Sequence, residues 1–230
     1  MTFAAHILHF IEHLRFPVKL PKDIEVMHPF NDAATMEVCR RFYNKFYTDT
    51  QQRTMIIGIN PGRFGGGVTG IPFTDPIRLK QDCGIDNPWP AKQELSSVYI
   101  YEMIKAFGGP AKFYSQFYIT AISPLGFTKD NKNLNYYDDK TLEEDIKPFV
   151  LDCFEKQFAF GINRGIAFCL GDGKNFKYLS KLNKEHKLFE TVVPLSHPRF
   201  IMQYKLKKKE EYIQKYVEAL NVISLEKKRR

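Results

Sequence analysis

Short apolar runs alternate with helical patterns along most of the chain. Four runs are nearly continuous in apolar residues and stop at turn residues, as buried strands do; they cover residues 54–60, 116–123, 165–170 and 188–195. In the segments around them, apolar residues recur with the helical period; these segments are 2–15, 33–47, 95–107, 141–160, 174–182 and 204–223. Asp32 is placed to cap the second helix, and Pro148 should break or kink the fourth.

This alternation predicts the fold. Strands that alternate with helices favour a parallel sheet with helices on both faces. We therefore expect an α/β protein of three layers, α-β-α, with a central, mostly parallel four-stranded sheet. A chain of 230 residues suits one domain over 1–230, with 1–50 as a helical N-terminal extension packed on it. Segments 27–32 and 128–139 are interpreted as loops.

Polar residues follow each predicted strand. Asn60 ends the first, an Asn-rich loop at 131–135 follows the second, Gly171 follows the third, and His197 follows the fourth. Because the carboxyl ends of parallel strands meet at one edge of a sheet, these loops should face one another. The sequence therefore predicts a functional site at this edge.

The loop after the first strand contains five glycines between residues 62 and 73 and ends in Pro72-Phe73. Its 62–69 stretch has Walker A spacing, but Val68 stands where that motif needs lysine. Its 65–70 stretch fits G-x-G-x-x-G, but the prolines that follow break the helix that a dinucleotide site requires. The loop is then either a flexible turn or the wall of a slot, and a Phe behind a rigid Pro favours the slot.

Charge and cysteine usage narrow the class of protein. The net charge of +8 and the sequence pI near 9.2 favour polyanionic partners such as nucleic acid. The four cysteines lack C-x-x-C spacing, so we expect no metal and no cofactor. No apolar run could span a bilayer and no leader precedes the first helix, so we expect no membrane association and no secretion signal. The expected location is the cytoplasm, at the nucleoid if the source is a bacterium.

Three motifs then resemble a known family. Residues 58–65 read G-I-N-P-G-R-F-G and 69–73 read T-G-I-P-F. Together they resemble the first motif of the single-strand-selective monofunctional type within the uracil-DNA glycosylase superfamily, G-M-N-P-G-P-F-G followed by T-G-V-P-F. Residues 123–127 and 132–134, S-P-L-G-F and K-N-L, resemble its second segment, C-P-L-x-F and R-N-L. Residues 197–199, H-P-R, resemble its last motif, H-P-S-P-R.

The chain also departs from this pattern. Arg63 stands in place of a proline, the second loop is one residue shorter, and the last motif lacks Ser-Pro. The resemblance is therefore to a divergent, bacterial-like branch. It implies a monofunctional DNA glycosylase of base excision repair, without lyase activity, that flips uracil out of DNA and hydrolyses its N-glycosidic bond. Other deaminated or oxidised bases are further expected substrates.

The resemblance assigns two residues to the chemistry. Asn60 would position the attacking water, and His197 would donate a hydrogen bond to uracil O2 as negative charge develops there. Without the resemblance, Asn60 could equally cap a turn and His197 could be an ordinary packed histidine.

The resemblance also assigns the base pocket. Asn133 would pair with the O4/N3 edge of the base, with Asn131 and Asn135 as competing candidates because the loop is shorter. Phe73 would stack on the flipped base. The pocket would be completed by residues of the first motif: Ile59, Gly62 and Phe64.

DNA contacts should come from the segment after His197 and from lysines. Arg199 and Phe200 are expected to enter the gap left by the flipped base, with Ile201, Met202 and Gln203 beside them. Lys174 and Lys205 could contact phosphates. We expect a monomer that binds uracil-containing DNA, single- or double-stranded.

Two other classes of function stay open on sequence alone. A non-catalytic nucleic-acid-binding protein on the same fold would bind DNA with strong salt dependence and release no base. A nucleotide-handling enzyme would use the glycine loop for phosphate and bind a free nucleotide tightly.

Overall fold

The computed structural model describes residues 1–227 and is organised around a parallel sheet of four strands. The strands lie in the order β3-β2-β6-β7, and their bounds are β2 (Arg53–Gly58), β3 (Phe117–Ala121), β6 (Ile162–Leu170) and β7 (Thr191–Leu195). The predicted α/β fold with a central parallel sheet of four strands is confirmed.

The burial of the central strand β2 explains why the first apolar run could be recognised in the sequence. All six of its residues are buried, because it is paired on both sides. Ile56 lies opposite Ile119 of β3 and Phe168 of β6. A strand covered on both faces and both edges is almost entirely apolar.

Helices cover both faces of this sheet. Their bounds are α1 (Phe3–Glu12), α2 (Ala33–Phe46), α3 (Gly66–Thr69), α4 (Pro76–Gln81), α5 (Leu95–Phe107), α6 (Pro110–Tyr114), α7 (Lys140–Asp145), α8 (Lys147–Phe158), α9 (Lys174–His186), α10 (Pro198–Tyr204) and α11 (Lys209–Lys227). Three-residue 3-10 helices occur at η1 (Pro29–Asn31), η2 (Tyr136–Asp138) and η3 (Leu206–Lys208).

Neighbouring residues of β3 show the two helical layers, because successive side chains on a strand point to opposite faces. The ring of Phe117 packs on Phe107 at the end of α5 and on Phe113 of α6, at centroid distances of 5.5 and 5.2 Å. The ring of Tyr118 lies 5.6 Å from that of Phe3 in α1. The sheet is therefore the middle of three layers, as predicted.

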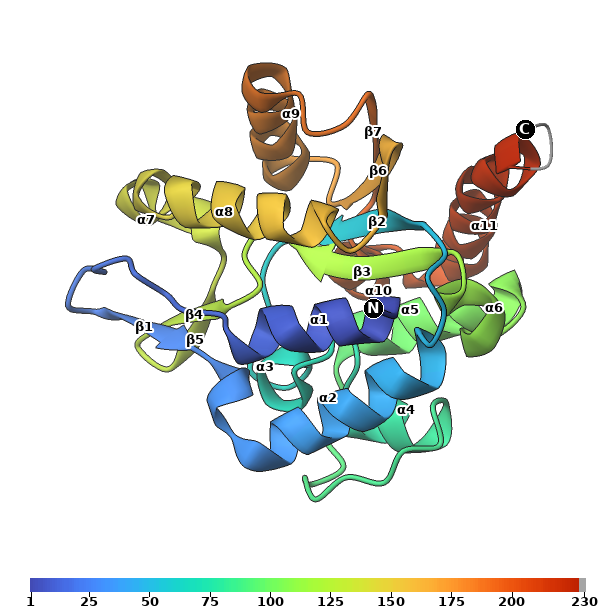
Figure 1. Ribbon diagram of the computed structural model, residues 1–230, viewed down its shortest axis with the longest axis horizontal. Helices are drawn as coiled ribbons and strands as arrows, with labels where there is room; N and C mark the ends of the chain where they lie inside the picture. Colours follow the sequence, from blue (N-terminus) through green and yellow to red (C-terminus); the bar gives the residue numbers. More distant parts are fainter. Residues whose placement is uncertain (228–230) are drawn as a thin grey trace.

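A second, antiparallel sheet was not predicted. It has the order β1-β4-β5, with bounds β1 (Ile24–Met27), β4 (Gly126–Lys129) and β5 (Lys132–Leu134). Figure 1 shows it beyond the carboxyl ends of β2 and β3. The interpretation of 128–139 as a loop is wrong, since β4 and β5 form a hairpin whose turn residues Asp130 and Asn131 have φ values of 49° and 54°. Positive φ at both turn residues matches the twist of a two-residue hairpin.

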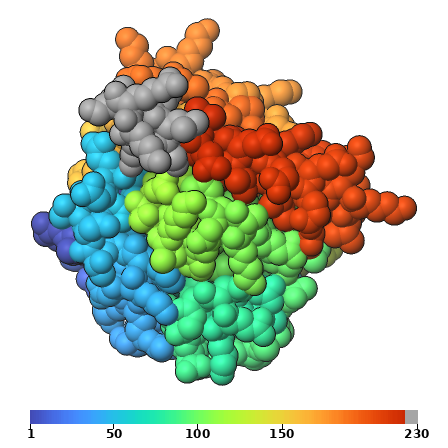
Figure 2. Space-filling model, turned by 90° about the vertical axis from the view of Figure 1, so that its right-hand side faces the viewer, coloured from blue at the N-terminus to red at the C-terminus, as the bar shows by residue number. Residues whose placement is uncertain are grey.

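The N-terminal segment belongs to the same body. Asp32 caps α2 by accepting a hydrogen bond from the backbone N–H of Thr35, as expected. The extension is not wholly helical, however, because β1 pairs with β4 in the small sheet. Figure 2 shows the surface of α2 (blue) directly against the segments around α6 (green) on the face that carries α11 (red).

The predicted break near Pro148 is confirmed, because the segment 141–160 forms two helices, α7 and α8, which meet at Ile146. Two other helical predictions need correction. The last helix is preceded by a separate short helix, α10, so Lys205 lies between helices rather than in the first turn of one. The glycine loop, expected to contain no helix, forms the single turn α3, which stops at Gly70. Within residues 1–227, no helix is both long and apolar enough to cross a bilayer.

Candidate functional site

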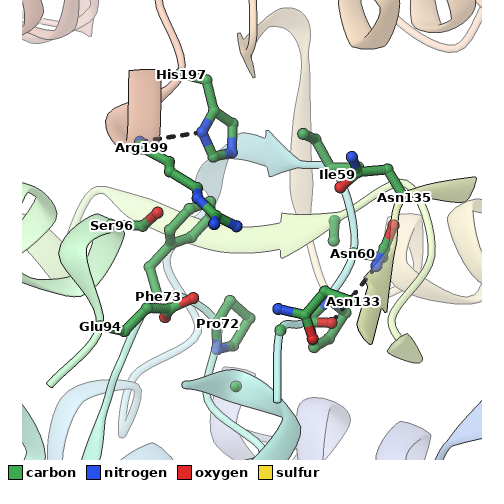
Figure 3. Close-up of a pocket in the computed structure, with 14 residues that line it drawn as sticks. Ile59, Asn60, Pro72, Phe73, Glu94, Ser96, Asn133, Asn135, His197 and Arg199 are labelled. Carbon is green, nitrogen blue, oxygen red and sulfur yellow. Dashed lines mark hydrogen bonds between the residues drawn. The ribbon is translucent and has the colours of Figure 1, made fainter. Parts of the chain in front are cut away.

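A cavity opens at the carboxyl edge of the large sheet, where the sequence predicted a site (Figure 3). Its volume of about 90 Å³ exceeds the ~10–15 Å³ that one water needs, so it can hold a larger group. We call this cavity the slot. Its lining residues are Ile59, Asn60, Pro61, Gly62, Gly66, Pro72, Phe73, Glu94, Ser96, Ala121, Asn133, Asn135, His197 and Arg199.

Asn60 is held by the small sheet. Its Oδ1 accepts a hydrogen bond from the backbone N–H of Tyr136, and its Nδ2 donates to the carbonyl oxygen of Leu134, both at 3.1 Å. These two bonds fix which end of the carboxamide is oxygen. An amide oxygen has two lone pairs, so Oδ1 can accept one more hydrogen bond. Asn60 is thus a rigid acceptor at the edge of the slot.

His197 faces the slot as a neutral donor. Its Nδ1 accepts a hydrogen bond from the backbone N–H of Arg199, 3.1 Å away, at the start of α10. The ring proton must therefore be on Nε2. Burial lowers the pKa of His197 to about 4, helped by the positive charge of Arg199 and opposed by Asp172. At neutral pH the imidazole is uncharged and its Nε2–H can donate.

The segment that carries His197 is anchored through the preceding residue. The Ser196 hydroxyl donates to the Asp172 carboxylate at 2.8 Å, and the Tyr216 hydroxyl donates to the Ser196 carbonyl oxygen. Both bonds tie this short connection to neighbouring segments. The imidazole is thereby fixed in direction before any ligand arrives.

Phe73 lies against the floor of the slot. Its φ of 53° is unusual for a bulky residue, and strain of this kind is found at functional sites. Its ring lies close to Gly58, on which a Cβ would be only 2.8 Å from Cε2 of Phe73. The Phe73 ring centroid is 6.0 Å from that of His197. The absence of a side chain at Gly58 therefore allows an aromatic surface beside the imidazole.

The three competing asparagines have different surroundings. Asn131 is a turn residue of the β4–β5 hairpin, and Asn135 uses its side chain to bond Asp138 at 2.7 Å in the cap of η2. Asn133 accepts a hydrogen bond from the Arg63 backbone N–H at 3.1 Å through Oδ1. Its Nδ2 is then left pointing over Gly62 as a donor. Asn133 has the geometry of a base reader.

Other predicted residues lie outside the slot. Phe64 is 44% exposed and lines an adjoining, more open cavity, where Arg63 and Lys92 lie over its ring at 5.2 Å each. Only Ile59, Gly62 and Phe73 of the first motif's predicted base contacts line the slot itself. An exposed aromatic ring beside basic side chains is typical of single-strand nucleic-acid contacts.

The predicted DNA-inserting residues separate in the structure. Arg199 lines the slot, whereas Phe200, Gln203 and Lys205 are exposed on or just after α10. Ile201, expected beside them, is buried, because it packs under the helix. The exposed apolar side chains here are Phe200, Tyr204 and Leu206. This projecting group has the shape of a wedge.

The two lysines expected at phosphates differ in their partners. Lys174 begins α9, lies 3.5 Å from the Asp138 carboxylate and stands over the Tyr137 ring. Lys205 lies over the Phe200 ring at 6.0 Å and forms no ion pair with any residue that the structure describes. Lys174 therefore has a carboxylate beside its charge, whereas Lys205 has an aromatic ring.

Sequence reasoning missed Glu94 and Ser96, which lie on the side of the slot opposite Asn60 (Figure 3). Glu94 directly precedes α5 without capping it through its side chain. Its place before the predicted helix was the only signal, and it did not point to a site. Within the described residues, no group of three or more His, Cys, Asp or Glu side chains is arranged to hold a metal ion.

Comparison with known proteins agrees with this geometry. The model of the uracil DNA glycosylase superfamily matches residues 45–221. The crystal structure of wild-type SMUG2 from Pedobacter heparinus is similar to this structure with a TM-score of 0.94 and 48% sequence identity, covering 97% of this chain and 99% of that one. No protein of curated function matches the chain.

Proposed function

Because this chain belongs to the uracil DNA glycosylase superfamily, we propose that it flips uracil out of DNA and hydrolyses the N-glycosidic bond with Asn60 and His197. The observation that carries the proposal is that these two side chains, from loops after different strands, line one slot together with Phe73. Cleavage leaves positive charge on the sugar and negative charge on the base. The slot offers a neutral acceptor for the water that attacks the sugar, and neutral donors for the base that departs.

Asn60 acts on the water. One lone pair of its Oδ1 accepts a hydrogen bond from the Tyr136 N–H, and the second accepts a hydrogen bond from the attacking water. An amide is too weak a base to take the proton, so its contribution is orientation. The two backbone bonds to β5 and η2 hold that orientation without cost at the moment of reaction.

His197 acts on the departing base. Its Nε2–H donates to a base carbonyl oxygen, and this bond strengthens as the oxygen becomes negative. One fixed donor of this kind contributes ~3–4 kcal/mol. A neutral imidazole is sufficient, and its low pKa keeps it from exchanging protons with the base near neutral pH.

Phe73 and Asn133 recognise the base. The Phe73 ring stacks on its face, and the Asn133 Nδ2 donates to an edge oxygen such as O4 of uracil. Hypoxanthine, xanthine and 5-hydroxymethyluracil carry a comparable oxygen. We include such deaminated and oxidised bases in the proposed substrate range.

The reaction is monofunctional. A lyase step needs an amine that forms a Schiff base with the sugar, and no lysine is among the residues that line the slot. The expected product is an intact strand with an abasic site.

DNA is engaged by the wedge and by basic side chains. Phe200 enters the space left by the flipped base, while Lys205 and Lys174 contact phosphates. The exposed ring of Phe64, with Arg63 and Lys92 beside it, stacks on a base next to the flipped nucleotide.

A gel assay tests the proposal. Wild-type protein should produce alkali-dependent scission of a uracil-containing oligonucleotide and no scission without alkali. Asn60→Ala and His197→Ala should each reduce single-turnover excision by about 10²-fold or more while DNA binding changes little.

Matched controls are available on distant, exposed positions. Asn44→Ala on α2 and His186→Ala on α9 change the same residue types outside the slot, and each should retain wild-type excision. Full excision by the double variant of Asn60 and His197 would refute the assignment. Salt-sensitive DNA binding without any abasic product would instead favour a non-catalytic binding protein.

A further inference from the structure

Glu94 is a carboxyl group within the slot to which neither the sequence motifs nor the proposed reaction assigns a role. It reaches the slot from the residue just before α5 and lies with Ser96 and Arg199 across from Asn133 (Figure 3). An ionised carboxylate here would repel a base that leaves as an anion, so the position of Glu94 needs a chemical reason.

The carboxyl group is closely fitted to the glycine loop. A Cβ on Gly65 would lie only 2.0 Å from Oε2 of Glu94, so no other residue fits at this position without moving the carboxyl group. A Cβ on Gly62 would lie 3.2 Å from Oε1 of Glu94 and 3.3 Å from Nδ2 of Asn133. Glu94 and Asn133 thus flank the same point above Gly62, and a base that Asn133 contacts is within reach of Glu94.

The charges around Glu94 favour its neutral form. The Asp75 carboxylate accepts a hydrogen bond from the Glu94 backbone N–H at 2.9 Å and places a second acid nearby. In the described part of the chain, no donor is hydrogen-bonded to the Glu94 carboxyl oxygens, and Arg199 lines the slot without forming an ion pair with them. Burial, and after it the nearby Asp75 carboxylate, raise the pKa of Glu94 to about 7 against the opposing positive charge of Arg199.

Among the described residues, the other charged groups at this position form no ion pair with Glu94. Arg63 and Lys92 lie over the Phe64 ring, and Arg63 and Lys132 line the adjoining open cavity together with Glu94. His197, on the far side of the slot, is uncharged above about pH 4. Arg199 is therefore the cation that shares the slot with the carboxyl group.

The reaction distinguishes the two forms of a carboxyl group. An ionised carboxylate only accepts hydrogen bonds and repels a base that leaves as an anion, whereas a neutral acid donates through its O–H. We propose that Glu94 contacts the flipped base in its neutral form, donating a hydrogen bond to an acceptor atom on the edge above Gly62, and that its ionisation slows excision. This role rests on the proposed glycosylase function and extends it to a third donor.

A pH profile of single-turnover excision tests this role. Wild-type excision should fall above pH 7, approaching tenfold for each pH unit, because only the protonated fraction donates. Glu94→Gln carries a neutral N–H donor at every pH, so its rate should stay within a few-fold of wild type at pH 6 and show no fall up to pH 8.5. Glu94→Ala should be about tenfold slower at pH 6 and equally flat.

Controls separate this inference from the function itself. Glu155→Gln, on an exposed position of α8, removes the same charge elsewhere and should keep the wild-type fall. A flat wild-type profile between pH 6.5 and 8.5 would overturn the role of Glu94, as would a Glu94→Gln protein that falls in parallel with wild type or is as slow as Glu94→Ala at pH 6. No excision by any of these proteins would count against the glycosylase function instead.

Discussion

The backbone N–H of Arg199 donates a hydrogen bond to Nδ1 of His197 across 3.1 Å, and this contact fixes the tautomer of the imidazole. The same bond makes His197 the N-cap of α10, the helix that carries the exposed Phe200. The proposed donor for the leaving base and the proposed wedge for the duplex therefore belong to one rigid unit. A shift in the position of His197 should therefore move Phe200 as well, and the reverse, because only two residues separate them.

The pH dependence of His197 follows from its surroundings. Its pKa of about 4 in the folded protein lies below the ordinary value of 6.5, so the unfolded chain binds the extra proton more readily between these values. The stability that comes from a neutral His197 is present above pH 6.5 and is lost as pH falls toward 4. Imidazole NMR titration should give a pKa near 4, and thermal melts should show His197→Gln losing less stability than wild type over this range. An imidazole titrating at 6.5 would contradict this prediction.

Gly58→Ala tests the fit of the base-stacking ring. The new Cβ would stand 2.8 Å from Cε2 of Phe73, so the ring must move out of its place beneath the base. Stacking of a base on an aromatic ring contributes ~1–3 kcal/mol, so kcat/KM for uracil excision should fall about tenfold. Phe73→Leu should show a similar loss. Unchanged kinetics of Gly58→Ala, with the melting temperature measured in parallel, would remove Phe73 from the base contact.

Asn133→Asp tests which atoms read the base. The new side chain still accepts the Arg63 N–H, but it replaces the free Nδ2 donor with an acceptor. An acceptor facing O4 of uracil costs about 1–3 kcal/mol, whereas it suits the amino group of cytosine. Parallel rates on uracil and cytosine oligonucleotides should shift toward cytosine by tenfold or more, while Asn44→Asp leaves the ratio unchanged. A constant ratio would assign base reading to another residue.

Phe200→Ala separates base flipping from the chemical step. Extrusion of a base from a duplex costs a few kcal/mol, and the exposed Phe200 ring can fill the space that the base leaves. Excision from duplex DNA should drop about tenfold, but excision from a single strand should change less than about threefold because no stack must be opened. The exposed Val222→Ala serves as the control. Equal losses on both substrates would show that Phe200 acts on binding in general.

The strands of the large sheet could be predicted because burial dictates their composition. Met55 to Ile57 of β2 are buried on both faces, so their sequence had to be continuously apolar. The predicted strand 54–60 was two residues too long, since β2 ends at Gly58, but Asn60 still follows it closely enough to place one polar group at the carboxyl edge. The expected convergence of Asn60 and His197 on one cavity is what the geometry shows.

The small sheet could not be predicted because tertiary pairing creates it. Strand β5 has only three residues, two of them exposed, so neither length nor alternation marked it. Strand β5 pairs with β4, and the other partner of β4 is β1, about 100 residues earlier in the chain, so that Ile24 meets Lys129 only in the folded protein. Glu94 could not be predicted as a site residue for a related reason: its place above Gly65 depends on how the start of α5 lies against the glycine loop.

The two bonds that link Asn60 to Leu134 and Tyr136 also join the large sheet to the small one. The carboxamide to which we assign the attacking water is therefore also a hydrogen-bonded link between the two sheets. Any condition that displaces the β4–β5 hairpin should abolish base excision while most of the molecule stays folded. Inactivation of this protein by mild heat or denaturant should accordingly precede its global melting, with hydrogen exchange rising first at Tyr136.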